Sequence, residues 1–237
     1  VEAFIADGRE QHIWDRVAGG AIRFRHTLLR DVAYDMLVSG ARRDLHLRAA
    51  RVLEQMAETP GVTRLNDLAH HFERAGQLDT ARQYLEAAGE LAQKQYQSVR
   101  AIGFFRRLAQ LGLPPAQDVE VSNRLGELLN KTGQWQEAAA VLEQALAVLL
   151  GYDKGRTEID ILIKLGDVIR KSGDQIRARE RRDLARVQAR RSGDLDLRCR
   201  ALAVLAGSHK YAGDYASSLT VYQEALALAE ETGDAYL

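Results

Sequence analysis

The sequence has a single cysteine, Cys199, among its 237 residues. No disulfide can form within the chain, which fits a protein kept in a reducing compartment such as the cytoplasm. No run of apolar residues approaches the roughly 20 that a membrane-spanning helix needs, and the first residues do not resemble a signal peptide. We therefore predict a cytoplasmic location and no membrane partner.

The chain also lacks an excess of charge of either sign, because 33 Lys and Arg residues are matched by 33 Asp and Glu residues. A basic chain that holds nucleic acid over its whole surface is therefore disfavoured. The hydrophobic fraction of 46% and the charged fraction of 28% indicate a folded chain with a buried core rather than a disordered one.

Catalytic and cofactor motifs are missing as well. The sequence has no phosphate-binding GxxxxGK[ST] or GxGxxG loop and no HExxH, CxxC or GxSxG motif. His70 and His71 are adjacent, so on a helix they would point about 100° apart and could not share one metal ion. We predict no catalytic residues, no metal site and no cofactor, so that the chain itself is not an enzyme. Paired catalytic carboxylates have no support in the pattern.

Only three prolines occur, Pro60, Pro114 and Pro115, and they divide the chain near residues 58–62 and 112–117. Elsewhere apolar residues recur every three or four positions, which is the period of a helix. Residues 21–25 alternate apolar and basic side chains, the pattern of a strand. The predicted fold is all-α, with a short β-strand element near the N-terminus.

The strongest feature is an internal repeat of 40 residues, present in three copies that stay in register without a gap. The aligned sets are Leu125, Leu165 and Leu205; Gly126, Gly166 and Ala206; Gly133, Gly173 and Gly213; Ala138, Ala178 and Ser218; Ala145, Ala185 and Ala225. Small residues let two facing helices approach closely, and glycine suits the left-handed conformation that ends a helix. Each copy is therefore predicted to be a helix hairpin, and hairpins must stack because one alone cannot bury its apolar face.

This pattern resembles the tetratricopeptide repeat, whose usual period is about 34 residues. The resemblance is carried by Asn123 to Gly126, by Ala138, Leu142 and Ala145 in the first copy, and by Ser218, Tyr222 and Ala225 in the last. It implies hairpins stacked as a right-handed superhelix over residues 116–237, with repeats at about 119–152, 159–192 and 199–232. A weaker copy implies degenerate helices of the same type over 62–113; it consists of Ala69, Gly76, Ala81, Leu85 and Ala88.

Residues at about 20–92 resemble a different element, the junction after the winged-helix end of bacterial signalling NTPases of the STAND and related AAA-like type. The resemblance implies that residues 1–58 are the end of such a winged-helix and linker region. After the strand we expect one helix from Thr27, its N-cap, to Val38 and a second from Ala41 to Ala57. The resemblance is carried by Phe24, His26, Leu29, Arg30, Asp31, Ala33, Tyr34, Leu37, Arg43, Leu45, His46, Ala50 and Leu53, and by the HHFERAG segment at 70–76. In such proteins tetratricopeptide-like helices follow, and nucleotide cyclase, Ser/Thr kinase or DNA-binding regulator domains are attached.

His26 stands where some of these NTPases have a histidine that contacts the phosphate of the bound nucleotide. The resemblance implies a nucleotide-sensing role for His26 in a longer parent protein, and an imidazole can donate to a phosphate oxygen. The alternative is that His26 packs at the corner between strand and helix.

In tetratricopeptide arrays the first helix of each repeat lines the concave surface. The resemblance therefore implies partner-binding positions at Asn123, Glu127, Asn130, Lys131, Ile163, Asp167, Arg170, Lys171, Ala203, Gly207, Lys210 and Tyr211. Lys131, Arg170 with Lys171, and Lys210 would form a cationic ladder that binds acidic side chains or a C-terminal carboxylate. The alternative is that these cations only interact with the negative ends of the helix dipoles.

A second patch is predicted in the arginine-rich helix at 177–191. Arg182 stands where the neighbouring copies have Leu142 and Tyr222, and Arg186 where they have Leu146 and Leu226. One interpretation is a docking patch for acidic protein or nucleic acid. The alternatives are that the arginine stems cover apolar surface while their heads reach water, or that the helix is rotated to bury Leu184 and Val187. No aromatic residues interleave with the arginines, so base stacking has no support.

The sequence thus predicts a non-catalytic interaction module, the sensor or scaffold arm of a larger bacterial signalling NTPase. It would contact the NTPase domain in cis and bind a protein or peptide of acidic character. The alternatives are a free-standing adaptor that binds peptides, and a fragment of a transcriptional regulator that touches nucleic acid through residues 177–191. The last copy lacks a polar capping helix, so we expect further repeats after Leu237 or self-association at this end.

Overall fold

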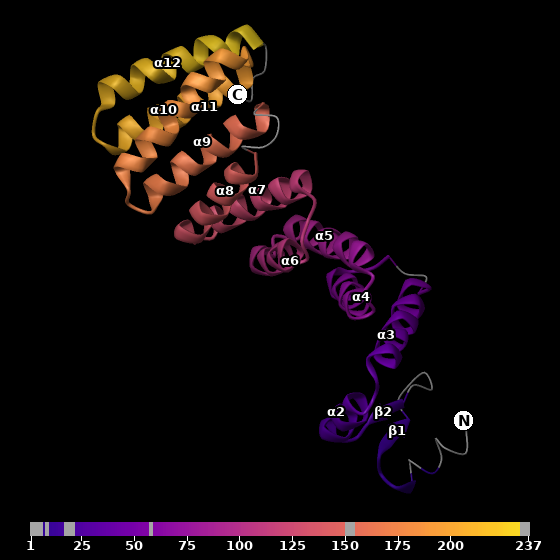
Figure 1. The fold of residues 1–237 in the computed structure, drawn as a ribbon. Coiled ribbons are helices and arrows are strands. Elements are labelled where there is room, and N and C mark those ends of the chain that lie inside the picture. Colours follow the sequence, from indigo (N-terminus) through magenta and orange to yellow (C-terminus); the bar gives the residue numbers. More distant parts are fainter. Residues whose placement is uncertain (1–6, 8–9, 17–21, 57–58, 150–154, 233–237) are drawn as a thin grey trace. The chain divides into compact units, whose positions relative to one another are not determined.

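The computed structural model describes residues 7, 10–16, 22–56, 59–149 and 155–232 (Figure 1). The chain forms two compact units, residues 1–84 and 85–237. The predicted all-α class with a short β element is confirmed, and the fold is a helical repeat of the tetratricopeptide type.

A two-stranded antiparallel sheet begins the first unit. Strand β1 (Trp14–Arg16) pairs with β2 (Ile22–Phe24), so that Trp14 lies opposite Phe24 with their rings edge to face and 5.8 Å apart. The strand predicted at 21–25 is confirmed. Strand β1 was missed, because three residues reading Trp-Asp-Arg show no alternation and only their pairing partner makes them a strand.

Three helices follow in this unit: α2 (Thr27–Asp35), α3 (Ser39–Glu54) and α4 (Val62–Arg74). The expected N-cap at Thr27 is wrong by one residue, because His26 holds the cap position with extended φ and ψ. Helix α2 ends before the expected Val38, and α3 starts at Ser39 rather than at Ala41. Helix α4 buries five side chains, whereas α2 buries none and α3 only Ala50.

The second unit begins inside helix α5 (Leu78–Lys94) and continues through consecutive helices. These are α6 (Ser98–Gln110), α7 (Pro115–Lys131), α8 (Trp135–Leu149), α9 (Arg156–Lys171), α10 (Gln175–Ser192), α11 (Leu195–Tyr211) and α12 (Tyr215–Thr232). Figure 1 shows α7–α8, α9–α10 and α11–α12 as successive hairpins that pack against one another.

Small residues hold the two helices of each hairpin close together. A Cβ atom added to Gly126 would lie 2.7 Å from the side chain of Leu142, and one added to Gly166 would lie 2.5 Å from Cγ of Arg182. Each of these hairpins turns at a glycine with positive φ, as at Gly133 (φ 77°). The amide of the next residue, Gln134, donates back to the carbonyl of Leu129 at 2.9 Å, the Schellman ending of a helix. The predicted roles of these glycines are confirmed.

Helices α5 and α6 form a further hairpin in the same register. Gly89, Tyr96, Ala101 and Phe105 have the same spacing as Gly126, Gly133, Ala138 and Leu142, and a Cβ on Gly89 would lie 2.9 Å from the ring of Phe105. This hairpin was not recognised from the sequence, where the weaker copy over 62–113 was identified only from Ala69 to Ala88. The reason is Tyr96, which occupies the turn position that carries glycine in the other copies.

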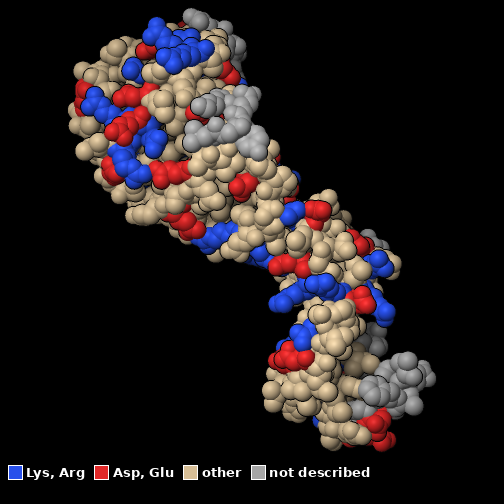
Figure 2. All heavy atoms as spheres, in the orientation of Figure 1, with Lys and Arg blue, Asp and Glu red and all other residues tan. Residues whose placement is uncertain are grey.

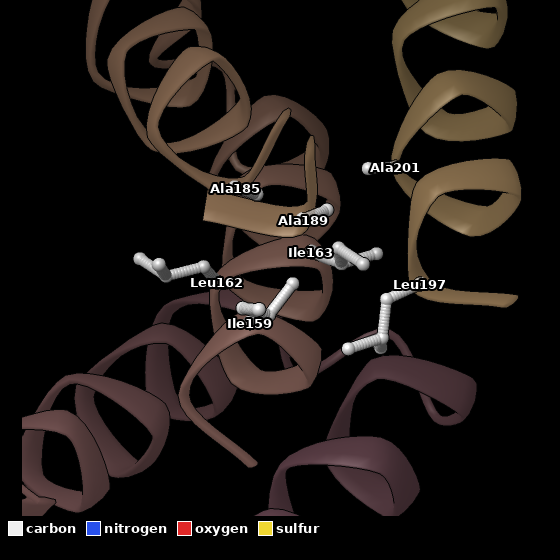
Figure 3. Packing of buried hydrophobic residues seen from close by; sticks show 7 residues of the cluster. All are labelled: Ile159, Leu162, Ile163, Ala185, Ala189, Leu197 and Ala201. Carbon is white, nitrogen blue, oxygen red and sulfur yellow. The ribbon is translucent and has the colours of Figure 1, made fainter. Parts of the chain in front are cut away.

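The hydrophobic core joins consecutive hairpins. One cluster combines α9, α10 and α11 (Figure 3); it consists of Ile159, Leu162, Ile163, Ala185, Ala189, Leu197 and Ala201. Burying one Leu or Ile side chain stabilises a fold by about 1.5–3 kcal/mol. Because side chains of α11 complete the core of the preceding hairpin, the hairpins of this unit depend on one another for stability.

The outer face of α12 carries an apolar stripe. Tyr215, Leu219, Tyr222 and Leu226 are all exposed and recur at three- and four-residue spacing. Such a stripe is what an uncapped repeat presents to the helix that would follow it. Further repeats or self-association at this end stay predictions.

Candidate partner-binding surface

Two polar bridges join the first helices of neighbouring hairpins, α7 and α9. In the first bridge, Lys164 donates from Nζ to Asn123 Oδ1 at 2.9 Å and pairs with Asp160 at 2.6 Å and with Glu127. The amide of Asn123 also donates to Asp160 at 3.2 Å. The side chain of Lys164 is only 18% exposed, so this bridge is a largely buried network.

The second bridge repeats the first one seven residues further along both helices, which is about two turns. Lys171 donates to Asn130 at 3.0 Å and pairs with Asp167 at 2.6 Å, and Asn130 donates to Asp167 at 3.4 Å. An Asn–Asp–Lys set is therefore present twice on the same pair of helices. Asn123, Asn130, Asp167 and Lys171 were all predicted on this surface, but the contacts that they make across it were not predicted.

The bridges shift the acidity of their aspartates. Burial alone would raise the pKa of Asp160, but hydrogen bonds and charges from Lys164 and Arg200 together lower it below its usual value. Burial alone would likewise raise the pKa of Asp167, but hydrogen bonds and charges from Lys171 and Arg170 together lower it. Both carboxylates are therefore held in their charged form.

The predicted cationic ladder is interrupted in its middle. Arg170 pairs with Asp167 at 2.8 Å and its guanidinium lies 4.3 Å from the ring centre of Tyr211. Lys171 is neutralised by the same aspartate. Lys131 and Lys210 are exposed and have no ion pair among the described residues. Ile163 was expected to line the surface, which is wrong because it is buried in the core.

Between α5 and α7 the first bridge has a full counterpart. Arg124 pairs with Glu90 at 2.6 Å, with Glu120 at 2.7 Å and with Glu86 at 3.8 Å. In the repeat register, Arg124 corresponds to Lys164, and the three glutamates correspond to Glu127, Asp160 and Asn123. Burial alone would lower the pKa of Arg124, but its hydrogen bonds and ion pairs with Glu90 and Glu120 together raise it.

The counterpart of the second bridge is open. By register it would join Gln93, Glu127 and Lys131. Glu127 instead pairs with Lys164 on the other side of α7, and a cavity of about 800 Å³ lies at this place. We call it the α5–α7 groove; its lining residues are Glu90, Gln93, Lys94, Tyr96, Ser98, Arg124, Glu127, Leu128 and Lys131.

Tyr96 lies at the edge of this groove in an unusual backbone conformation. Its φ is 59°, in the left-handed region, and its side chain is 93% exposed. A side chain in this region costs roughly 1–2 kcal/mol per residue, and such strain is often found at functional sites. Glu127 and Lys131 are among the predicted partner-binding positions, whereas no residue of α5 is, because the 40-residue repeat that gave those positions begins after α5.

The groove presents net positive charge to a ligand. Glu90 and Glu127 are already paired with Arg124 and Lys164. Lys94 and Lys131 are exposed and form no ion pair among the described residues. More generally, positive and negative side chains lie next to one another over much of the face shown in Figure 2.

The second predicted patch differs from expectation. Arg182 is only 7% exposed, its Nε donates to its own helix at Ala178 O at 3.0 Å, and its Nη1 has no hydrogen-bond partner among the described residues. Its head is therefore largely withdrawn from the surface, although Arg182 lines a cavity between α10 and α11. The rotated-helix alternative is wrong, because Leu184 and Val187 are exposed. Arg186 is exposed, as a surface patch requires.

In the first unit, His26 is exposed at the start of α2 and its side chain makes no capping hydrogen bond. Its nucleotide-sensing role stays a prediction. The structure reveals a different histidine cluster, in which His46 contacts Tyr34 Oη at 2.9 Å and His71 Nδ1 at 2.8 Å. Burial, followed by the charges of His71 and His70, lowers the pKa of His46. Within the described residues, no group of three His, Cys, Asp or Glu side chains is arranged to hold a metal ion.

Among the described helices, none is both long and apolar enough to cross a membrane. Residues 123–155 and 201–236 match the tetratricopeptide repeat family by sequence. The chain thus carries tetratricopeptide repeats, and the matched segments cover the first and third of the predicted 40-residue copies. No curated protein matches the chain by sequence.

Solved structures show the same fold at low sequence identity. A Rap protein complexed with competence and sporulation factor aligns with a TM-score of 0.57 and 16% identity, over 87% of this chain and 66% of that one. MamA (residues 41 to the end) from Desulfovibrio magneticus RS-1 gives 0.54 and 14%, over 83% and 100%. YrrB, a tetratricopeptide protein with an unusual peptide-binding site, gives 0.52 and 15%, over 85% and 90%. These likenesses concern the fold alone.

Proposed function

We propose that this chain is a non-catalytic module that binds a protein or peptide segment in the α5–α7 groove. The observation that carries the proposal is the open second bridge, where Gln93 and Lys131 line a cavity instead of binding each other across the helices. A ligand bound there would contact Gln93 and Lys131. It would take the place of the contacts that are made within the protein at the next pair of helices, by Asn130, Asp167 and Lys171. Protein and peptide binding is the general activity of tetratricopeptide repeats, and YrrB and the Rap protein supply related examples.

The chemistry of the groove favours an acidic segment with an apolar or aromatic side chain. Lys94 and Lys131 are free to pair with carboxylates, whereas the carboxylates of the groove are already paired. Tyr96 offers an exposed ring whose two side-chain torsions cost little entropy to fix on binding. Aromatic residues of this kind are frequent centres of binding energy at interfaces.

The test is a selection of random peptides on the immobilised chain, followed by fluorescence anisotropy with the selected peptides. We expect an enrichment of Asp and Glu, and binding weakened at least about tenfold by Lys131→Glu, since one tenfold step is only ~1.4 kcal/mol and facing like charges cost more. Tyr96→Ala should weaken binding as well.

Lys210→Glu is the matched control for this experiment. Lys210 is also an exposed lysine in the last turn of a first helix, α11, but it does not line the groove. Its reversal should leave the affinity unchanged. Equal affinities for wild type and Lys131→Glu would refute the groove as the binding site. A loss of affinity confined to Lys210→Glu would instead favour binding at the predicted cationic ladder.

We also propose that the module is the regulatory arm of a larger bacterial signalling NTPase, located in the cytoplasm. This rests on the resemblance of residues 20–92 and on the exposed apolar side chains of α2 and α3, among them Leu28, Val32 and Leu45. Exposed apolar side chains gathered on neighbouring helices are typical of faces covered by another domain. Ligand binding would switch such an NTPase only if its two states differ in affinity for the ligand.

This wider proposal is tested on the parent gene. A P-loop domain ending in a winged helix upstream of Val1 is expected, and His26→Ala in that protein should alter its resting nucleotide occupancy. If no such domain is encoded there, the chain is a free-standing peptide-binding adaptor. The nucleic-acid alternative relies on Arg186, which is exposed, more than on Arg182, which is largely buried.

A further inference from the structure

The second helix of the middle hairpin holds a buried arginine where the other hairpins have hydrophobic or aromatic residues. Arg182 corresponds to Phe105, Leu142 and Tyr222 in the repeat register. Its stem packs against Gly166, as the side chain of Leu142 packs against Gly126. The guanidinium therefore lies in a position that an uncharged side chain occupies in the other hairpins.

The charge of this guanidinium is only partly compensated within the protein, by Asp183 and Asp167, which form no ion pair with it. No carboxylate lies within ion-pair distance of Arg182 among the described residues, and its Nη1 is buried without a hydrogen-bond partner. Burial, followed by repulsion from Arg170, lowers the pKa of Arg182, with Asp183 and Asp167 acting in the opposite sense. A guanidinium nevertheless stays protonated in proteins. An isolated buried charge is strongly unfavourable unless an ion of opposite sign accompanies it.

A cavity of about 510 Å³ adjoins Arg182 between α10 and α11. Arg179 and Arg186 line it from the same helix, and Ser208 and His209 from α11. Arg186 has no ion pair among the described residues, and Arg179 only a loose one of 3.9 Å with Asp183.

Two carboxylates line the cavity, those of Asp183 and Asp214, and Asp214 already has partners within the protein. Asp214 accepts the amide of Ser217 at 3.1 Å as a cap of α12 and pairs with His209 at 3.3 Å. The cavity therefore holds more positive charge than its own carboxylates neutralise.

We propose that this cavity is a binding site for an oxyanion of the size of phosphate, with Arg182 as its buried anchor and Arg179 and Arg186 at its rim. The planar fork of arginine binds phosphate and carboxylate oxygens in pairs. The anion is either free inorganic phosphate or a phosphoryl or carboxylate group carried by another molecule. The site shares no residue with the α5–α7 groove, so each of the two proposals can be tested independently of the other.

The test is thermal unfolding of the chain in sodium phosphate, in sodium acetate and in sodium chloride, all at equal ionic strength. A ligand that binds only the folded state raises the Tm as its concentration rises. We expect phosphate to raise the Tm of the wild type by several degrees relative to chloride. Arg182→Leu, which restores the residue of the first copy, should raise the Tm in chloride and abolish the phosphate response.

Arg181→Leu is the matched control, because it removes one positive charge from the same helix at a position that does not line the cavity. It should keep the phosphate response of the wild type. A rise in acetate as well as in phosphate would mean that carboxylates also bind; a rise in phosphate alone would restrict the site to tetrahedral anions.

A phosphate response that persists unchanged in Arg182→Leu, or a wild type that responds equally to all three salts, would overturn the proposal. Should Arg182→Leu fail to fold, Arg186→Gln replaces it as the probe, because Arg186 is exposed and its loss does not disturb the core. It should shift the phosphate midpoint to higher concentration; an unshifted midpoint would overturn the site.

Discussion

The α7–α9 and α5–α7 helix pairs share one register but differ in how they are joined. Between α7 and α9, both bridges are closed, by Lys164 and by Lys171. Between α5 and α7, only the bridge at Arg124 is closed, and the position of the second is a groove. The comparison shows that one pattern of facing helices can serve as support at one step of the array and as a candidate binding site at the next.

The difference follows from the pairing of a single side chain. Glu127 lies on α7 between two lysines, Lys131 in its own helix and Lys164 on α9, and it pairs with Lys164. Lys131 is thereby left free for a ligand. A repeat protein can thus create a binding position without changing its fold, by directing one charged residue to the neighbouring repeat.

The largest expected effect is the loss of the first closed bridge. Lys164→Met should destabilise the second unit by about 2 kcal/mol, because the largely buried Asp160 is left with Arg200 as its charged partner and Glu127 loses its ion pair. Arg124→Met at the corresponding α5–α7 position should cost about 1 kcal/mol, since its two close partners, Glu90 and Glu120, are more exposed than Asp160. Urea unfolding followed by circular dichroism measures both, and equal losses would contradict the distinction between the two steps.

Acid should weaken the α7–α9 step specifically. The folded-state pKa values of Asp160 and Asp167 are lowered from a usual value of 3.8. Their stabilisation is therefore fully present above that value and is lost as the pH falls through the folded-state pKa values. Hydrogen exchange between pH 5 and pH 2.5 should show α9 opening, and Asp160→Asn with Asp167→Asn should flatten this pH dependence. An unchanged slope in the double variant would show that other carboxylates are responsible.

Substitutions of Lys171, in the second bridge, and of Lys131, in its open counterpart, should have different effects. The first should lower stability and the second should weaken binding. Lys171→Met should cost about 1 kcal/mol, because Asp167 and Asn130 lose a partner. Lys131→Met should change stability by less than about 0.5 kcal/mol, as expected of an exposed side chain, but should weaken the binding of selected acidic peptides. A stability loss at Lys131 matching that at Lys171 would mean that the open bridge closes in solution.

The smallest effect is expected at the turn that borders the groove. Tyr96→Gly relieves the left-handed strain at this residue but also makes the unfolded chain more flexible. We expect a net stabilisation of about 0.5 kcal/mol, together with weaker peptide binding. Gly133→Ala, at the equivalent turn of the next hairpin, should destabilise by about 1 kcal/mol. A destabilised Tyr96→Gly variant would show that the ring of Tyr96 stabilises the fold rather than a complex.

Much of the fold was predictable because it is periodic. Gly126, Gly166 and their partners at a constant offset revealed helix hairpins before any coordinates, since close helix packing requires small residues at fixed positions. The hairpin of α5 and α6 escaped because Tyr96 replaces the marker glycine. Strand β1 escaped because pairing, not local pattern, defines it. Of the candidate site, Glu127 and Lys131 were anticipated from the register, whereas Lys94 and Tyr96 were not.

The amino-acid sequence by itself determined the helix hairpins, their turns and the residues that face the neighbouring repeat, because each depends on spacing along one chain. Only the tertiary structure decided which of those residues are free. Lys131 and Lys171 each follow an acidic residue by four positions, Glu127 and Asp167. Lys171 pairs with Asp167, whereas Glu127 pairs with Lys164 of the neighbouring helix and leaves Lys131 exposed. Arg182 shows the same limit: its charge is visible in the sequence, and its burial without a counter-ion is a property of packing alone.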